Sequence, residues 1–434
     1  MKRLNFLGLL FICAWSSSYA EQEPLPTPLT LDYVLDLPTS MSPEVMRQQA
    51  RLLQAQGHRA ELNAQDRVQF DLQARLGKRE FMGEGQDYNM AALHMGLPLY
   101  DFGRTANQDQ AWLWDTKARQ YQLQAIEKQF RLDLMQAYFN VLLADIHYRV
   151  ENEAMAIAYV TLDKVQENHE IGRESDANLY ASEESYQKAF VKRQQAQANL
   201  RRSRMLLANA MGRSDAVISR VSLPDWSNLP EKLLKVEDYL ALALDHNPQV
   251  LAMKQAFEAS GYRVEGARAG KRPEIRADAW IGQLSSYPDV REGHYHAEVS
   301  INVPLYDGGL TKSRVDRERA QRQQIQANLY QAQQQIREQV TNLYFELSLL
   351  DVEKQAVQAG QTFADFNLDY KRAIYENELQ ADLGDAMVRI SQAHYDALAF
   401  DLKRALLWAK MQALTGQDDL SEAKISQQTN MPLE

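Results

Sequence analysis

The chain has almost no cysteine. Its 434 residues contain one, Cys13, inside an N-terminal segment with the character of an export signal. A lipoprotein signal has a small residue directly before its cysteine, and Ile12 occupies that position, so we expect no lipid anchor. Removal of the signal would leave no thiol for a disulfide, a thiolate metal site or a cysteine nucleophile.

Long apolar runs are also missing beyond residue 20. No stretch reaches the roughly 18 apolar residues that a membrane-spanning helix needs, and the mean hydropathy is −0.49. We therefore expect no transmembrane helix. The chain could then associate with a membrane only through a β-barrel or by peripheral contact. The net charge of −10 and the isoelectric point of about 5.5 argue against a nucleic-acid partner.

The first twenty residues resemble a cleaved secretion signal. Lys2 and Arg3 give a positive start, Leu4 to Trp15 form a short apolar core, and Ser18-Tyr19-Ala20 is a small-residue cleavage site. We expect cleavage after Ala20. The alternative is an N-terminal membrane anchor, for which the apolar run is short.

Proline is absent from two long stretches. None occurs between Pro98 and Pro224 or between Pro304 and Pro432. Each stretch predicts two helices, of about 65 and about 40 residues, and the longer would extend about 100 Å. Such helices must pack side by side with others along their length, because ordinary globular helices have only about a dozen residues.

The chain repeats itself. Leu97-Pro98-Leu99-Tyr100-Asp101-Phe102-Gly103 recurs as Val303-Pro304-Leu305-Tyr306-Asp307-Gly308-Gly309, and the same offset relates Tyr138-Phe139 to Tyr344-Phe345. This predicts a signal peptide at 1–20, a first structural repeat at 21–223, a second at 224–416 and a C-terminal tail at 417–434. The proline-containing segment from Ser222 to Lys232 forms the junction.

Each repeat also contains two segments of alternating polarity. We predict strands at about 67–77 and 89–99, and at about 274–283 and 295–305, followed in each repeat by long helices at about 104–211 and 310–415. In the first strand the apolar positions are Val68, Phe70, Leu72, Ala74 and Leu76. This alternation is typical of a membrane barrel strand, and the alternative is a half-buried soluble sheet. Four strands are too few to close a barrel, so the subunits must share one.

Two direct repeats, each with a Pro-Leu-Tyr-Asp-x-Gly strand end leading into a long helix, resemble the TolC family of outer-membrane channel tunnels. The resemblance implies an α+β membrane protein, a homotrimer whose twelve strands form one β-barrel in outer-membrane lipid. That barrel would be continuous with a periplasmic α-helical barrel. It also implies that the helical tips dock on a periplasmic membrane-fusion adaptor and an inner-membrane pump or ABC exporter. Strand-to-helix turns are expected at Pro98, Gly103, Pro304 and Gly309.

The resemblance further assigns roles to the two helical tips. The implied adaptor-docking residues are Gly172, Arg173, Ser175, Asn178, Leu179, Glu376, Glu378 and Leu383. Asn178 stands where the family has aspartate, and Glu376 stands where glycine is usual. Glu378 replaces an arginine that helps to lock the gate in the best-known member. Asp382 and Asp385 share one helix face and would form a ring of carboxylates that attracts cations at the periplasmic mouth.

No enzyme motif competes with this interpretation. The chain has no phosphate-binding loop and no nucleophile–base arrangement, so we expect neither catalysis nor a cofactor. His294 and His296 could form a metal pair, but no third ligand stands beside them, and we expect no metal. The sequence predicts a passive exit duct for a tripartite efflux pump or type I secretion system. It does not distinguish drug, metal-ion and polypeptide cargo. The alternative is a periplasmic helical scaffold without a pore.

Overall fold

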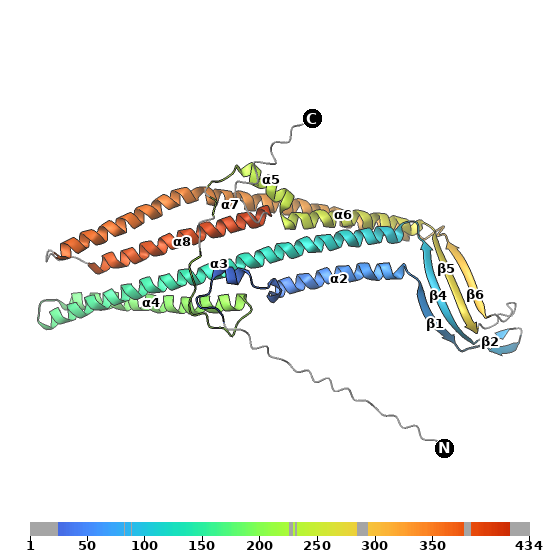
Figure 1. Ribbon diagram of the computed structural model, residues 1–434, viewed down its shortest axis with the longest axis horizontal. Helices are drawn as coiled ribbons and strands as arrows, with labels where there is room; N and C mark the ends of the chain where they lie inside the picture. The colour runs from blue at the N-terminus through green and yellow to red at the C-terminus, as the bar shows by residue number, and fades with distance from the viewer. Residues whose placement is uncertain are drawn as a thin grey trace, which may run out of the picture.

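The computed structural model describes residues 25–81, 83–87, 89–224, 229–230, 232–283, 294–376 and 383–416. The expected signal peptide and C-terminal tail, and the tip residues Glu378 and Asp382, lie outside the described residues. The molecule is elongated, with helices running along most of its length and a β-sheet at one end (Figure 1).

Four long helices form the body. They are α3 (Arg104–Glu170), α4 (Asp176–Ala210), α7 (Leu310–Glu376) and α8 (Leu383–Thr415). The helices α3 and α7 have 67 residues each, which corresponds to about 100 Å. The helix α3 packs against α4 and α8, and α7 packs against α8. Both hairpins point away from the sheet (Figure 1). Within the described residues, no helix combines the length and apolarity needed to cross a membrane.

Shorter helices complete the bundle. They are α1 (Leu31–Leu35), η1 (Thr39–Met41), α2 (Pro43–Gln65), α5 (Val236–His246), α6 (Pro248–Arg268) and η2 (Ala269–Lys271). Two of them, α2 and α6, run toward the sheet (Figure 1). The helices α2 and α6 each begin with proline at a position that needs no N–H donor, after the capping residues Ser42 and Asn247. They pack along α3, and α6 also packs along α7.

The sheet joins strands from both halves of the chain. It contains β1 (Gln69–Arg75), β4 (Met90–Tyr100), β5 (Glu274–Gln283) and β6 (Tyr295–Asn302) in the antiparallel order β1-β4-β5-β6. The pairing of β4 with β5 therefore unites two segments far apart in sequence. A second hairpin, β2 (Lys78–Phe81) and β3 (Glu84–Asp87), lies between β1 and β4, in the segment between the strands predicted at about 67–77 and 89–99, where no strand is predicted.

The apolar core lies at the middle of the bundle. One cluster surrounds the buried Tyr138 of α3, whose hydroxyl is 2.9 Å from the backbone oxygen of Leu29 and 2.6 Å from that of Ser222. A second cluster surrounds Tyr239 of α5 and includes Trp408 of α8. A parallel bridge between Leu29 and Val221 adds to the first cluster. These contacts anchor the N-terminal segment and the junction to the long helices.

Candidate functional site

One face of the four-stranded sheet is apolar and exposed. The strand register aligns Phe70, Met95, Ala279 and Ala297 in one row, and Leu72, Leu93, Ile281 and Tyr295 in the next. Phe70 is 65% exposed, Leu72 is 79% exposed and Val299 is 64% exposed. An apolar surface of this kind indicates contact with a partner or with a membrane.

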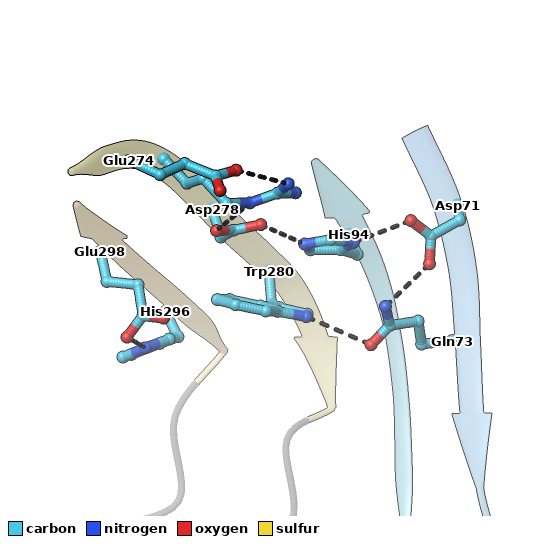
Figure 2. A network of polar contacts seen from close by, with 9 residues as sticks. Asp71, Gln73, His94, Glu274, Asp278, Trp280, His296 and Glu298 are labelled. Atoms are coloured by element: carbon cyan, nitrogen blue, oxygen red, sulfur yellow. Dashed lines mark hydrogen bonds and ion pairs between the residues drawn. The ribbon is translucent and has the colours of Figure 1, made fainter. Parts of the chain in front are cut away.

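The opposite face of the same sheet is polar and densely bonded (Figure 2). The register aligns Asp71, His94, Trp280 and His296 across all four strands. The indole N–H of Trp280 donates to Gln73, at 3.3 Å, and Nε2 of His296 lies 3.1 Å from Glu298. Each strand therefore places apolar side chains on one face and polar side chains on the other.

His94 is the centre of the polar face. Its Nδ1 lies 2.8 Å from Oδ1 of Asp71, and its Nε2 lies 3.0 Å from Oδ1 of Asp278. Its ring stacks on Trp280 with 4.6 Å between the ring centroids. Gly96 leaves the space for this arrangement, because a Cβ there would lie 3.3 Å from Oδ1 of Asp278. The sequence does not predict the His94 site, because the partners of His94 come from strands that lie far apart in the chain.

The edges of the sheet are open in the single chain. Among the described residues, β1 pairs only with β4, and β6 pairs only with β5. Each edge strand thus presents unpaired backbone N–H and C=O groups along one side, a ready template for another strand.

The strand-to-helix turns contain three of the four residues predicted there, and the fourth, Pro98, lies inside a strand. Gly103 (φ 90°) and Gly309 (φ 89°) both adopt left-handed backbone directly before α3 and α7. Pro304 follows β6, but Pro98 lies inside β4 at an irregularity between Pro98 and Tyr100. This bulge pairs Tyr100 with Ile275 and so turns Tyr100 onto the apolar face.

Two aspartates of the repeated motif stabilise these turns, a role that the sequence alone does not predict. Asp101 accepts from the backbone N–H of Gly103 at 3.1 Å and of Thr105 at 2.6 Å. Asp307 repeats the pattern with Gly309 at 3.0 Å and Thr311 at 2.8 Å. Hydrogen bonds from Thr311 and from the backbone of Gly309 lower the pKa of Asp307 to about 2.

The first helical tip is a tight turn between α3 and α4. Gly172 has φ 72°, and the N–H of Arg173 donates back to the carbonyl oxygen of Asn168 at 2.8 Å. Ser175 caps α4 by accepting from the N–H of Asn178 at 3.2 Å. Asn178 also donates to Glu174, and Leu179 follows in the first turn of α4. The tip thus gathers the docking residues expected from the sequence on one exposed turn.

The second tip is described only at its two ends. Glu376 ends α7, Leu383 begins α8, and Asp385 lies in the first turn of α8 with an exposed side chain. The roles expected for these residues stay predictions.

A stripe of exposed apolar residues runs along α7. Phe345, Leu349, Val352, Ala356, Ala359, Phe363, Phe366 and Tyr370 repeat at alternating spacings of four and three residues and are all exposed in the single chain. We call these residues the α7 seam. This spacing is the pattern by which helices pack side by side through a continuous apolar seam.

Within the described residues, no group of three His, Cys, Asp or Glu side chains is arranged to hold a metal ion. His296 bonds to Glu298 on the same strand, and His294 lies just before β6.

Comparisons with known proteins agree with this geometry. A family model described as outer membrane efflux protein matches residues 239–417. The outer membrane efflux protein BepC of Brucella suis biovar 1 (strain 1330) is 24% identical over 226 residues, which cover 47% of this chain and 50% of BepC. The chain thus matches about half the length of this curated relative.

Solved structures show the same fold over nearly the whole chain. The crystal structures of CusC, described as revealing conformational changes on folding and transmembrane channel formation, match with a TM-score of 0.73 and 15% identity. The match covers 92% of this chain and 96% of CusC. The Campylobacter jejuni CmeC outer membrane channel matches with a TM-score of 0.73 and 14% identity, over 89% of this chain and 85% of CmeC. The matched family, BepC and CmeC are all described as outer-membrane proteins. Over residues 239–417 the chain therefore resembles the outer membrane efflux proteins, and it shares the largely helical fold of the solved TolC-type channels.

Proposed function

We propose that three copies of this chain form a passive exit duct through the outer membrane. The observation that carries the proposal is the two-faced, open-edged sheet joined directly to helices of 67 residues. The apolar face contacts lipid and the polar face lines an aqueous passage. This division places apolar side chains in lipid and polar side chains in water, as in a membrane β-barrel.

The open edges support a shared barrel. The edge strand β6 of one copy would pair with β1 of the next, so that three four-stranded sheets supply twelve strands. Closure removes every unpaired edge, which a sheet in lipid requires. Four strands alone are too few, since about eight are needed to enclose packed side chains.

The α7 seam supports a helical tunnel below the barrel. Its large members are more than half exposed, among them Phe366 at 71%. Packing against long helices of a neighbouring copy would bury this stripe, and three copies would surround a continuous duct. Residues 21–223 and 224–416 would act as the two repeats of each copy.

The tips provide the contacts with other proteins. Gly172, Ser175 and their neighbours would dock on a periplasmic adaptor, which connects the duct to an inner-membrane pump or ABC exporter. Asp382 and Asp385 would line the periplasmic mouth as a ring of carboxylates. Transport energy would come from these partners, because the duct itself is passive.

Fractionation and electrical recording test the proposal together. The expected result is a heat-resistant trimer in the outer-membrane fraction that forms ion-conducting pores in planar bilayers. Deletion of the gene should abolish export by its efflux or secretion system. A monomeric periplasmic protein without conductance would instead identify the helical scaffold.

A further inference from the structure

His94 is held between two carboxylates from different strands. Asp71 on β1 faces one ring nitrogen at 2.8 Å, and Asp278 on β5 faces the other at 3.0 Å. Neutral imidazole has one N–H donor and one acceptor lone pair, so it can satisfy only one carboxylate. Both contacts are favourable together only when the ring is the doubly protonated imidazolium. Figure 2 shows the ring between the two acids.

The surroundings of His94 keep the ring in this position. The side chains of His94 and Asp278 are each 14% exposed, whereas that of Asp71 is 52% exposed. Trp280 stacks against the ring, and Gly96 lies close to it, because a Cβ at Gly96 would be 3.4 Å from Cε1 of His94. Proton loss would place a lone pair against a carboxylate, and the more exposed Asp71 is the partner that can move away.

We propose that proton binding at His94 sets the fixed charge of the channel lining and thereby its preference between cations and anions. This inference rests on the proposed function, in which the polar face lines the passage.

The sign of the effect follows from the charged groups on the polar face. Besides His94, these are Asp71 and Arg75 on β1, Glu274, Arg276 and Asp278 on β5, and His296 and Glu298 on β6. The four carboxylates are opposed by two arginines and by the His94 imidazolium. Deprotonation of His94 removes one positive charge per chain, and therefore three from the lining of a trimer. A more negative passage concentrates cations and repels anions.

Ion selectivity in planar bilayers tests this inference. The reversal potential under a KCl gradient should show a stronger cation preference at about pH 9 than at about pH 6, a range in which histidine titrates. His94→Gln should show the strong preference at both values, and His94→Lys the weak preference at both. His296→Gln should keep the part of the shift that His94 supplies, because the two-carboxylate contact lies at His94.

Two outcomes separate the inference from the proposed function. A full wild-type pH shift in His94→Gln would overturn the role of His94 while leaving the duct intact. Absence of conductance in the wild type would overturn the duct itself.

A second measurement is independent of assembly of the variants. The ¹⁵N shifts of the His94 ring in the wild-type protein should show two protonated nitrogens at about pH 6. A neutral ring at that pH would also overturn the inference.

Discussion

At the scale of single residues, Asp101 and Asp307 connect the sheet to the long helices. Each aspartate accepts two backbone N–H groups at a helix start, where such groups otherwise have no partner. The helix N-terminus also favours a negative charge. The repetition of this arrangement in both halves explains why Pro-Leu-Tyr-Asp-x-Gly occurs twice.

Acid should weaken the cap formed by Asp307. Its pKa falls from 3.8 to about 2 on folding, so its stabilising effect is complete above about pH 4. The effect should disappear as the pH falls from about 4 toward about 2. The melting temperature of the detergent-solubilised protein should therefore depend on pH in this range more strongly in the wild type than in Asp307→Asn. Equal pH dependence in both proteins would contradict the assigned role.

Removal of both tip aspartates should change selectivity at the periplasmic mouth. Replacing Asp382 and Asp385 by Asn would remove up to six negative charges from a trimer. Cation preference and block by trivalent cations should fall in planar bilayers, while trimer stability should hardly change. The effect should shrink in about 1 M salt, where the screening length is about 3 Å. Unchanged block at low salt would contradict this prediction and would show that both residues lie on an ordinary solvated helix face.

At the scale of single elements, β6 allows its two faces to be tested side by side. Val299→Arg places a charge on the apolar face and should cost about 2–4 kcal/mol near the middle of a bilayer. Ser300→Arg lies on the polar face opposite Arg276, where like charges should cost at most about 1 kcal/mol. The measurement is the yield of heat-resistant trimer. Equal yields from the two variants would show that the sheet does not face lipid.

The first helical tip should depend on its glycine. Gly172→Leu puts a branched side chain at φ 72° on the exposed turn, whereas Asn tolerates this backbone better. We expect Gly172→Leu to lose export while trimers remain in the outer membrane, and Gly172→Asn to retain more export. Normal export by Gly172→Leu would remove the docking role of the tip.

The elements show which features the sequence could predict. Strand faces follow a period of two, so the positions of Phe70 and Leu72 were accessible from local pattern. The absence of proline likewise predicted α3 and α7. The pairing of β4 with β5 was not accessible, because it unites the two halves of the chain, and the His94 site depends on that pairing. The β2–β3 hairpin was missed because its short polar segments lack an alternating pattern.

At the scale of the whole molecule, among the described residues the single chain leaves its sheet edges unpaired and leaves its apolar sheet face and the α7 seam exposed. Lipid can cover the apolar face, but it cannot pair the backbone of β1 and β6. The α7 seam lies on a helix that we place in the periplasm, where water surrounds an isolated chain. In the proposed trimer a second copy would supply both partners, because one rotation would bring β6 to β1 and α7 to a neighbouring helix pair.

Charges on the α7 seam should therefore prevent assembly without unfolding the chain. Leu349→Glu with Phe363→Glu would desolvate two carboxylates in the contact, whereas both positions are exposed in the monomer, at 56% and 55%. We expect a monomer with normal helical content by circular dichroism and no heat-resistant trimer. Gln358→Glu is the matched control, because Gln358 is exposed on α7 outside the seam and its variant should still form trimers. Trimer formation by the double variant would mean that subunits meet elsewhere. Loss of helicity would instead show that the seam packs within the chain, because charges on a surface that only another copy covers leave the isolated helix intact.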